Sequence, residues 1–387
     1  MGITLGRAAM VAVKECHMTS RKSAVGSAVT VGIDLHSTNH LVAILDAEGR
    51  LLLTQRLNNR LVETLALLNR YRERVTGIAV ESTYNGYWLI DGLQDAGYRV
   101  HLAHSPAVEK RRTTKYADDE TDAILLAELL REGRLPEGYL YPREERGLRD
   151  LLRRRMLLVQ NQTSVLLSLQ SLLLRQRSRA LTGNDLKRLP EEELLRNITD
   201  PFVQHQVHAL FSSLRALQQA VEQIERETLP ARKVDAQFQR LLTIPGIGNV
   251  LGLIIRLEAG DMSRFKTAGD FVSYCRLAPS AHFSNGRKKG EGNRKCGNRY
   301  LAWAFLEAAQ FCRRYCPEAQ QYYQRKKRCG RAFSTAIASK ALASKLARSA
   351  YVMLTTGQAF DAGRAFGVLR QRGEASRTRG CGVTAMV

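Results

Sequence analysis

The sequence predicts an α/β domain near the N-terminus, a long helical hairpin after it, and a mainly α-helical C-terminal domain. Short β-rich runs alternate with helical stretches up to about residue 140. Apolar residues, mostly leucine, then recur at heptad spacing between residues 144 and 228. From residue 241 to about 356 the apolar pattern is again helical, apart from a glycine- and lysine-rich segment at 284–298.

These patterns divide the 387 residues into five predicted segments. The two ends lack a periodic apolar pattern and are expected to be flexible. The segments are a leader, the α/β domain, a coiled-coil hairpin, the helical domain and a tail, at 1–28, 29–140, 141–235, 236–357 and 358–387.

The α/β domain begins with three consecutive β-rich runs, VTVGIDL, HLVAILDAEG and LLLTQRL, at 29–35, 40–49 and 51–57. Consecutive strands joined by short turns favour an antiparallel meander. Strands at 77–81 and 98–103 then alternate with helices at about 60–73 and 87–96, which predicts a mixed sheet. A helix is predicted at 119–131, because DETDAILLAELLR starts with acidic residues and continues apolar at helical spacing.

The heptad region contains two apolar repeats. Leu151, Leu158, Val165 and Leu172 are spaced by seven, and a second series between residues 210 and 224 is spaced by four and three. A connector with glycine and proline separates them, so a long helical hairpin is predicted. The periodicity is equally compatible with two ordinary amphipathic helices that pack on a globular core.

The balance of charge indicates a polyanionic partner. The chain has 59 Lys and Arg against 37 Asp and Glu, a formal net charge of +22. Such an excess of positive charge is most often found in proteins that bind nucleic acid, although a ribosome-like assembly or an anionic membrane surface would also attract it. No stretch reaches the roughly 20 consecutive apolar residues of a membrane span, and the seven cysteines form no C-x-x-C pair. We therefore expect a soluble, intracellular protein with reduced thiols.

Four carboxylates lie where an α/β fold can gather them. Asp34 and Glu81 close two predicted strands, and Asp119 and Asp122 are three residues apart at the start of a helix. Carboxylates from separate segments can hold two divalent ions about 4 Å apart for phosphodiester cleavage, and Mg²⁺ suits such hard oxygen ligands. Taken singly, each is also explained as a turn residue or as a charge favoured at a helix N-terminus.

Three stretches of the C-terminal half are candidates for nucleic-acid contacts. The turn with Gly246 and Gly248 resembles a helix-hairpin-helix turn, whose backbone N–H groups contact phosphate, but it also fits a plain helix connection. The two other stretches fit phosphate contacts and base stacking, and equally a solvated surface. They are a glycine-rich segment with Arg287, Lys288, Lys289, Arg294, Lys295 and Arg299, and a helix with Tyr322, Tyr323, Arg325, Lys326, Lys327 and Arg328.

Several of these segments resemble, in the same order, the transposases of the insertion-sequence 110 family, most closely its 1111-type subgroup. The resemblance covers roughly residues 29–357 and is carried by VGIDLH, ESTYNGYWL, DETDA, LLTIPGIGNVLG and the segment 279–305. It implies a RuvC-like, RNase H-like domain with a metal-binding Asp-Glu-Asp-Asp set, which matches Asp34, Glu81, Asp119 and Asp122. Asp118 is an adjacent candidate, and Tyr84-Asn85 stand where the family often has Gly after E-x-T.

The resemblance also implies a serine nucleophile in the C-terminal domain, followed by K-x-G-N before a helix. The corresponding residue is Ser284, which precedes Asn285-Gly286 rather than Gly directly, and Ser280 lies four residues earlier. What the resemblance further implies is strand exchange through a serine-linked DNA intermediate, at a composite site of both domains. An RNA encoded by the element would guide the choice of double-stranded target and donor DNA.

The expected assembly is a homo-oligomer, dimer or tetramer, that meets through the coiled coil. Its expected location is the bacterial cytoplasm, at the nucleoid and not at a membrane. Two other functions remain open: a metal-dependent junction nuclease that uses water and leaves Ser284 idle, and a non-catalytic nucleic-acid-binding protein. Loss of activity on replacing Ser284 separates the first from the transposase, and metal-dependent strand cleavage separates the second.

Overall fold

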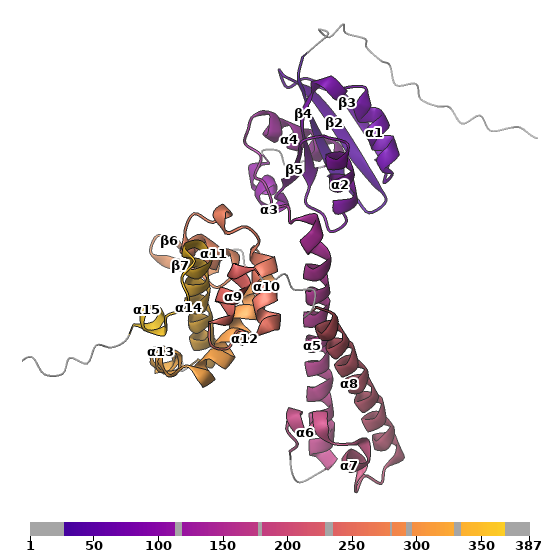
Figure 1. The fold of residues 1–387 in the computed structure, drawn as a ribbon. Helices are drawn as coiled ribbons and strands as arrows, with labels where there is room; N and C mark the ends of the chain where they lie inside the picture. Colours follow the sequence, from indigo (N-terminus) through magenta and orange to yellow (C-terminus); the bar gives the residue numbers. More distant parts are fainter. Residues whose placement is uncertain are drawn as a thin grey trace, which may run out of the picture. The chain divides into compact units, whose positions relative to one another are not determined.

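The computed structural model describes residues 27–112, 118–176, 180–228, 235–278, 281–291, 296–328 and 334–367. It consists of two compact units, Met1–Leu140 and Tyr141–Val387 (Figure 1). The first is an α/β domain and the second is mainly helical, as the sequence predicts. The division of the second unit into a hairpin and a separate domain stays a prediction.

The first unit contains a five-stranded mixed sheet with the order β3-β2-β1-β4-β5. The strands β1, β2 and β3 form the predicted antiparallel meander, and β4 and β5 continue the sheet parallel to β1. All seven residues of β1 are buried because it is the central strand. The bounds are Val29–Leu35, Asn39–Asp46, Leu51–Asn58, Val75–Glu81 and Val100–Ala103 for β1 to β5.

Helices cover both faces of this sheet (Figure 1). On one face α1 (Leu61–Asn69) and α2 (Tyr87–Asp95) bury leucines against the odd-numbered residues of β1, from Val29 to Leu35. On the other face α4 (Asp119–Arg131) lies across β1, β2 and β4. Side chains alternate along a strand, so Thr30, Gly32 and Asp34 face α4. Two short elements, α3 (Ser105–Val108) and η2 (Glu109–Arg111), follow β5, and η1 (Arg72–Arg74) precedes β4.

Gly32 allows α4 to lie directly on the sheet. A Cβ atom at this position would be 2.0 Å from the carbonyl oxygen of Ala123 and 2.7 Å from the backbone nitrogen of Ala127. Both atoms belong to the backbone of α4 and cannot rotate away. The close approach brings the first turn of α4 beside the end of β1, where Asp34 lies.

We expect Gly32→Ala to destabilise the protein by about 1–3 kcal/mol or more, because an overpacked core must displace α4. The control is Gly138→Ala, since a Cβ there would meet the nearest atom, Leu102 Cδ2, at an ordinary 3.5 Å. Urea unfolding of the full chain measures the difference. Equal stability of the two variants would contradict the close packing of α4.

Two long helices begin the second unit. α5 (Arg143–Gln176) packs along α8 (Pro201–Thr228), and α6 (Gly183–Arg188) and α7 (Glu191–Leu195) close the connection between them (Figure 1). The buried positions of α5 include Leu152, Leu166 and Leu173. Of the four heptad positions named from the sequence, Leu151, Leu158 and Val165 are only half-buried. The residue that follows is buried after Leu151 and Val165, and half-buried after Leu158. The apolar stripe is therefore rotated by about one residue, and a coiled coil stays a prediction.

One property of α5 differs from the sequence analysis. Among the described helices, α5 has the length and average apolarity that a membrane span needs. Uncharged Gln, Asn, Ser and Thr interrupt its leucines, so no long run of consecutive apolar residues marks this helix in the sequence. Part of its apolar surface packs against α8, so a helix of a soluble protein accounts for the same composition.

The remaining helices of the second unit surround α14 (Thr335–Thr356). This helix packs against α9 (Ala236–Leu242), α11 (Ala268–Tyr274), α12 (Arg299–Tyr315), α13 (Pro317–Arg328) and α15 (Ala362–Phe366). α10 (Asn249–Ala259) packs on α9 and α12, and η3 (Met262–Arg264) and the hairpin of β6 (Ala281–Ser284) and β7 (Arg287–Glu291) complete the unit.

The predicted flexible tail at 358–387 is wrong for its first ten residues. The helix α15 lies within it, and Phe366 is buried against Tyr322 and Phe360. No periodic apolar pattern is visible in this segment, because five helical residues are fewer than two turns.

Candidate functional site

Two carboxylates meet at one edge of the sheet. Asp34 is the penultimate residue of β1, and Glu81 is the last residue of β4. The strands are parallel and Ile33 pairs with Val80, so the next residue on each strand reaches the same edge. The Glu81 side chain lies close enough to that of Asp34 to raise its pKa. The fold thus joins two predicted site residues that are 47 positions apart in the sequence.

The first turn of α4 adds two more carboxylates, Asp119 and Asp122. Both charges act on Asp34. The neighbouring Asp118 has a different role, because it is the N-cap residue and its side chain accepts a hydrogen bond from the backbone N–H of Thr121. This cap explains why the helix begins where it does. Asp119 rather than Asp118 is therefore the residue that belongs to the cluster.

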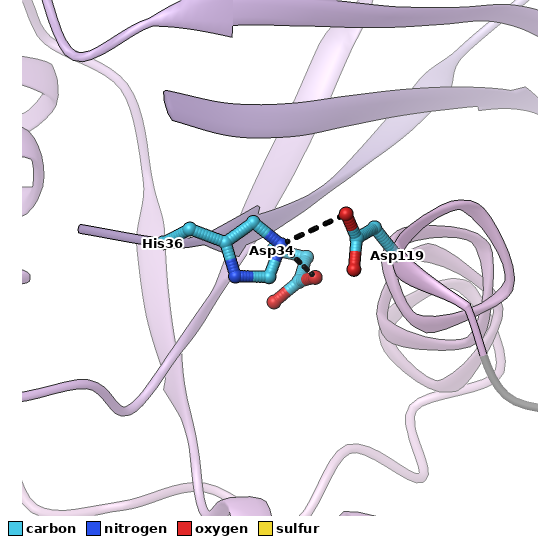
Figure 2. Close-up of side chains that lie close together, drawn as sticks. All are labelled: Asp34, His36 and Asp119. Carbon is cyan, nitrogen blue, oxygen red and sulfur yellow. Dashed lines mark ion pairs between the residues drawn. The ribbon is translucent and has the colours of Figure 1, made fainter. Parts of the chain in front are cut away.

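His36 lies between the two carboxylates from β1 and α4. Figure 2 shows its ring directed at Asp34 and Asp119. The Nε2 atom is 3.2 Å from Oδ2 of Asp34 and 3.2 Å from Oδ2 of Asp119. One donor atom from each of the three residues lies within 4.8 Å of the others, which is close enough for a shared metal ion.

Burial and like charge strongly affect Asp34. Its side chain is 4% exposed. Burial, the hydrogen bond with Glu81 and the charges of Glu81, Asp122 and Asp119 raise the pKa of Asp34 from 3.8 to about 8. At neutral pH this carboxyl therefore keeps its proton unless a cation replaces it. A divalent ion is the natural replacement, since hard cations take carboxylate oxygens.

Two arginines neutralise the outer carboxylates. Arg56 on β3 donates a hydrogen bond of 2.6 Å to Oδ2 of Asp119, and this bond holds the pKa of Asp119 below its usual value. Arg112 makes a close ion pair with Asp122. Among the contacts found in the described residues, neither Asp34 nor Glu81 has an arginine partner. When Asp34 is ionised, its charge is therefore not offset by an arginine of the described residues.

Sequence reasoning missed His36, Arg56 and Arg112. A signal for His36 existed, because residues i and i+2 of an extended segment point to the same side and Asp34 was already a candidate. No such signal existed for Arg56, whose position depends on the register in which β3 pairs with β2. Arg112 precedes a stretch outside the described residues and reaches Asp122 only through the fold.

The segment around Ser284 is a β-hairpin, which its glycine- and lysine-rich composition did not predict. Asn285 and Gly286 form its turn with φ angles of 50° and 71°. Two positive φ values are required by a type I′ turn, for which Asn-Gly is the preferred pair. Ser284 is the last residue of β6 and precedes this turn. Its side chain, and that of Lys288, lie outside the described part of the structure, as do Ser280, Arg294 and Lys295.

The end of the same segment starts α12. Asn298 caps the helix by accepting hydrogen bonds from the N–H groups of Tyr300 and Leu301. Its Nδ2 atom donates a bond of 2.7 Å to the buried Glu258, which also pairs with Arg153 of α5. The Asn of the K-x-G-N motif is thus explained by a helix start that is fixed to the core. Arg287, Lys289 and Arg299 are exposed.

The two glycines of the P-G-I-G turn differ in their surroundings. A Cβ on Gly246 would lie 2.6 Å from the backbone nitrogen of Cys312 and 2.8 Å from the carbonyl oxygen of Ala308. Close packing on α12 therefore explains Gly246 without a nucleic acid. Gly248 caps α10 and has open space around it, so a phosphate contact at this helix N-terminus remains a prediction for Gly248.

The basic cluster Arg325, Lys326, Lys327 and Arg328 forms the last turn of α13. Cations are favourable at this end of a helix because of its dipole. Tyr323 is 3% exposed and belongs to the core, so it is unable to stack on a base. Tyr322 is covered in part by Phe366 and by Arg325 and Lys326, which lie 5.5 and 5.7 Å from its ring centre. Base stacking, one of the two alternatives for this cluster, is therefore wrong for Tyr323.

Comparison with known proteins adds what the geometry alone leaves open. A model described as Transposase IS116/IS110/IS902 family matches residues 238–324, and a DEDD model described as Transposase matches residues 31–176. Together they span more than half of the chain, and the second contains the carboxylate cluster. The chain is therefore a transposase, an enzyme that acts on DNA. More specifically, it belongs to the insertion-sequence 110 family and has that family's DEDD domain at its N-terminal end.

Individual proteins agree with the two family models. The transposase for insertion sequence element IS1328 of Yersinia enterocolitica is 26% identical over 86% of this chain and 98% of its own length. The transposase for IS1111A of Coxiella burnetii is 23% identical over 72% of this chain and 76% of its own length. Among solved structures, T. thermophilus RuvC in complex with a Holliday junction substrate matches 29% of this chain and 99% of its own, with 16% identity and a TM-score of 0.24.

Proposed function

We propose that the protein exchanges DNA strands of an insertion sequence, with divalent ions on a carboxylate cluster and with Ser284 as the nucleophile. One observation carries the first half of this proposal. Asp34, Glu81, Asp119 and Asp122 converge from β1, β4 and α4, and burial with mutual repulsion raises the pKa of Asp34 to about 8. Such a concentration of carboxyl groups gains most from bound divalent cations.

The proposed ion is Mg²⁺, in a two-metal site. The four carboxylates offer the hard oxygen donors that Mg²⁺ prefers. When bound, the ions would supply Lewis-acid stabilisation to the attacking and leaving oxygens of a phosphodiester. The strand order 3-2-1-4-5, with three antiparallel strands followed by two parallel ones, supports an RNase H-like, RuvC-like domain for this site.

Ser284 is proposed to form the covalent DNA intermediate. Its hydroxyl oxygen would form a bond to the scissile phosphorus while the bond from phosphorus to a deoxyribose oxygen breaks. The hydroxyl proton passes to a base or to water, and the released deoxyribose oxygen takes up a proton. A serine hydroxyl is a weak nucleophile without such activation. The exposed Arg287 and Lys289 beside the turn support a place for phosphate here.

The proposed assembly is a dimer or tetramer that meets through a coiled coil. Leu157, Leu167 and Leu174 of α5 support it, because they are exposed at 44%, 60% and 55% although they are large and apolar. The proposed location is the bacterial cytoplasm at the nucleoid. Membership of a transposase family favours this location, since the substrate of a transposase is DNA.

One experiment tests the central proposal. The full-length protein is incubated with double-stranded DNA that carries the ends of its own element, with Mg²⁺ or with EDTA. Strand cleavage that needs Mg²⁺ and leaves protein attached to DNA is the expected result. Cleavage without attached protein would favour a junction nuclease that uses water. Binding without cleavage would favour a non-catalytic nucleic-acid-binding protein.

We predict that an RNA encoded by the element binds tightly and with strong salt dependence. The net charge of +22 supports contacts to many phosphates. With six to ten such contacts, the affinity should fall by roughly 10³ to 10⁵ between 50 and 200 mM salt. Sequencing of the RNA that co-purifies with the protein tests the guide function. Random cellular RNA, with no preference for sequences that flank the gene, would show that general basicity is the whole explanation.

A further inference from the structure

We propose that His36 is a nitrogen ligand of the divalent ion in the carboxylate cluster and shifts its preference from Mg²⁺ toward Mn²⁺. This inference rests on the proposed metal site and names a ligand outside the four carboxylates. It follows from the position of one atom, Nε2 of His36, between the carboxylates of Asp34 and Asp119 (Figure 2).

The distances fit a shared ion. Two ligands at neighbouring octahedral positions, each about 2.1 Å from the ion, lie about 3.0 Å apart. Nε2 is 3.2 Å from an oxygen of each carboxylate. The Nε2 atom is buried and forms no hydrogen bond of regular geometry within the described residues, whereas the His36 side chain as a whole is 37% exposed.

The backbone holds His36 in this position. Its N–H donates a hydrogen bond of 2.9 Å to the carbonyl of Asn39. Its own carbonyl accepts bonds from the side chains of Asn59, at 2.9 Å, and Asn85, at 3.1 Å. Asn85 lies in the loop after Glu81, where the sequence departs from the family pattern. This loop therefore fixes the residue that we propose as a ligand.

The type of donor atom determines which divalent ion the site prefers. Imidazole nitrogen suits transition ions, whereas Mg²⁺ is satisfied by carboxylate, carbonyl and water oxygens. Mn²⁺ accepts both kinds of donor and keeps the octahedral geometry of a two-metal site. Arg56 binds the same Oδ2 atom of Asp119, so this carboxylate is oriented by a second contact, as ligating groups commonly are.

The test is electron paramagnetic resonance of Mn²⁺ bound to the full-length protein. A directly bound imidazole gives electron spin echo modulation from ¹⁴N, which carboxylates and water do not. The variant His36→Gln should lose this modulation and bind Mn²⁺ at least about tenfold more weakly, with a smaller change for Mg²⁺. The control His101→Gln removes a histidine of the same unit that pairs with Glu137, and it should keep both properties.

The possible results distinguish an error about His36 as a ligand from an error about the metal site as a whole. Mn²⁺ that binds the wild type without ¹⁴N modulation, or equally well after His36→Gln, would overturn the role of His36 and leave the carboxylate site intact. No bound Mn²⁺ and no bound Mg²⁺ would overturn the metal site itself. The wild-type spectrum decides the question even when the His36→Gln chain fails to fold.

Discussion

Replacing Asp34 by Asn is expected to reduce DNA cleavage by about 10³-fold or more, because bound metal contributes several kcal/mol to the transition state. The substitution preserves size and removes the buried charge that the cations offset. DNA and RNA binding should persist, since no basic residue changes. Cleavage of end-labelled DNA at saturating Mg²⁺ measures the effect. Full activity of Asp34→Asn, or of the wild type in EDTA, would rule out the metal site.

The same variant should stabilise the metal-free protein. The folded-state pKa of Asp34, about 8, lies above its unfolded value near 3.8, so the folded state binds the extra proton between these values. Wild-type stability therefore falls as pH rises from about 4 to about 8. Asn carries no charge, so this decline should be smaller in Asp34→Asn. Thermal melting in EDTA across this pH range measures it.

Asp118→Asn is the matched control for Asp34→Asn. It removes one carboxylate next to the cluster, but Asn is as good an N-cap residue as Asp. Since the side chain of Asp118 binds Thr121 and not the cluster, activity and metal binding should change little. A loss of activity as large as that of Asp34→Asn would mean that Asp118 belongs to the metal site.

Replacing Ser284 by Ala is expected to abolish the covalent adduct and strand exchange. The substitution removes one hydroxyl and no charge, so binding of DNA and RNA should remain within about twofold of the wild type. The control Ser280→Ala should remain active. Denaturing gels with labelled DNA detect the adduct, and peptide sequencing of the trapped complex locates it. A nucleotide on Ser280 or on a tyrosine would identify a different nucleophile, and cleavage that persists in Ser284→Ala would favour hydrolysis by water.

Local signals gave the elements of the first unit. The bounds of β1 and α4 agree with the sequence prediction, because a β-rich run and an acidic helix start are properties of neighbouring residues. The Asn285-Gly286 turn was equally local, and its dipeptide was present in the sequence. Its two positive φ angles are those that an Asn-Gly turn adopts.

Burial was harder to predict wherever it depended on distant segments. Tyr323 and Phe366 are core residues of the second unit, although one adjoins a basic cluster and the other lies in a glycine-containing tail. Gly246 is explained by α12, which lies about 60 residues further along the chain. In each case the partner belongs to an element that sequence spacing does not connect.

The sequence by itself determined the α/β and helical composition of the chain, its strong positive charge and the identity of four candidate carboxylates. Their convergence was decided by tertiary structure, because it requires the parallel pairing of β1 with β4 and the contact of Gly32 with α4. The raised pKa of Asp34 and the place of His36 between two carboxylates follow from that packing. Electrostatic interaction depends on distance and burial, and neither is a property of spacing along the chain.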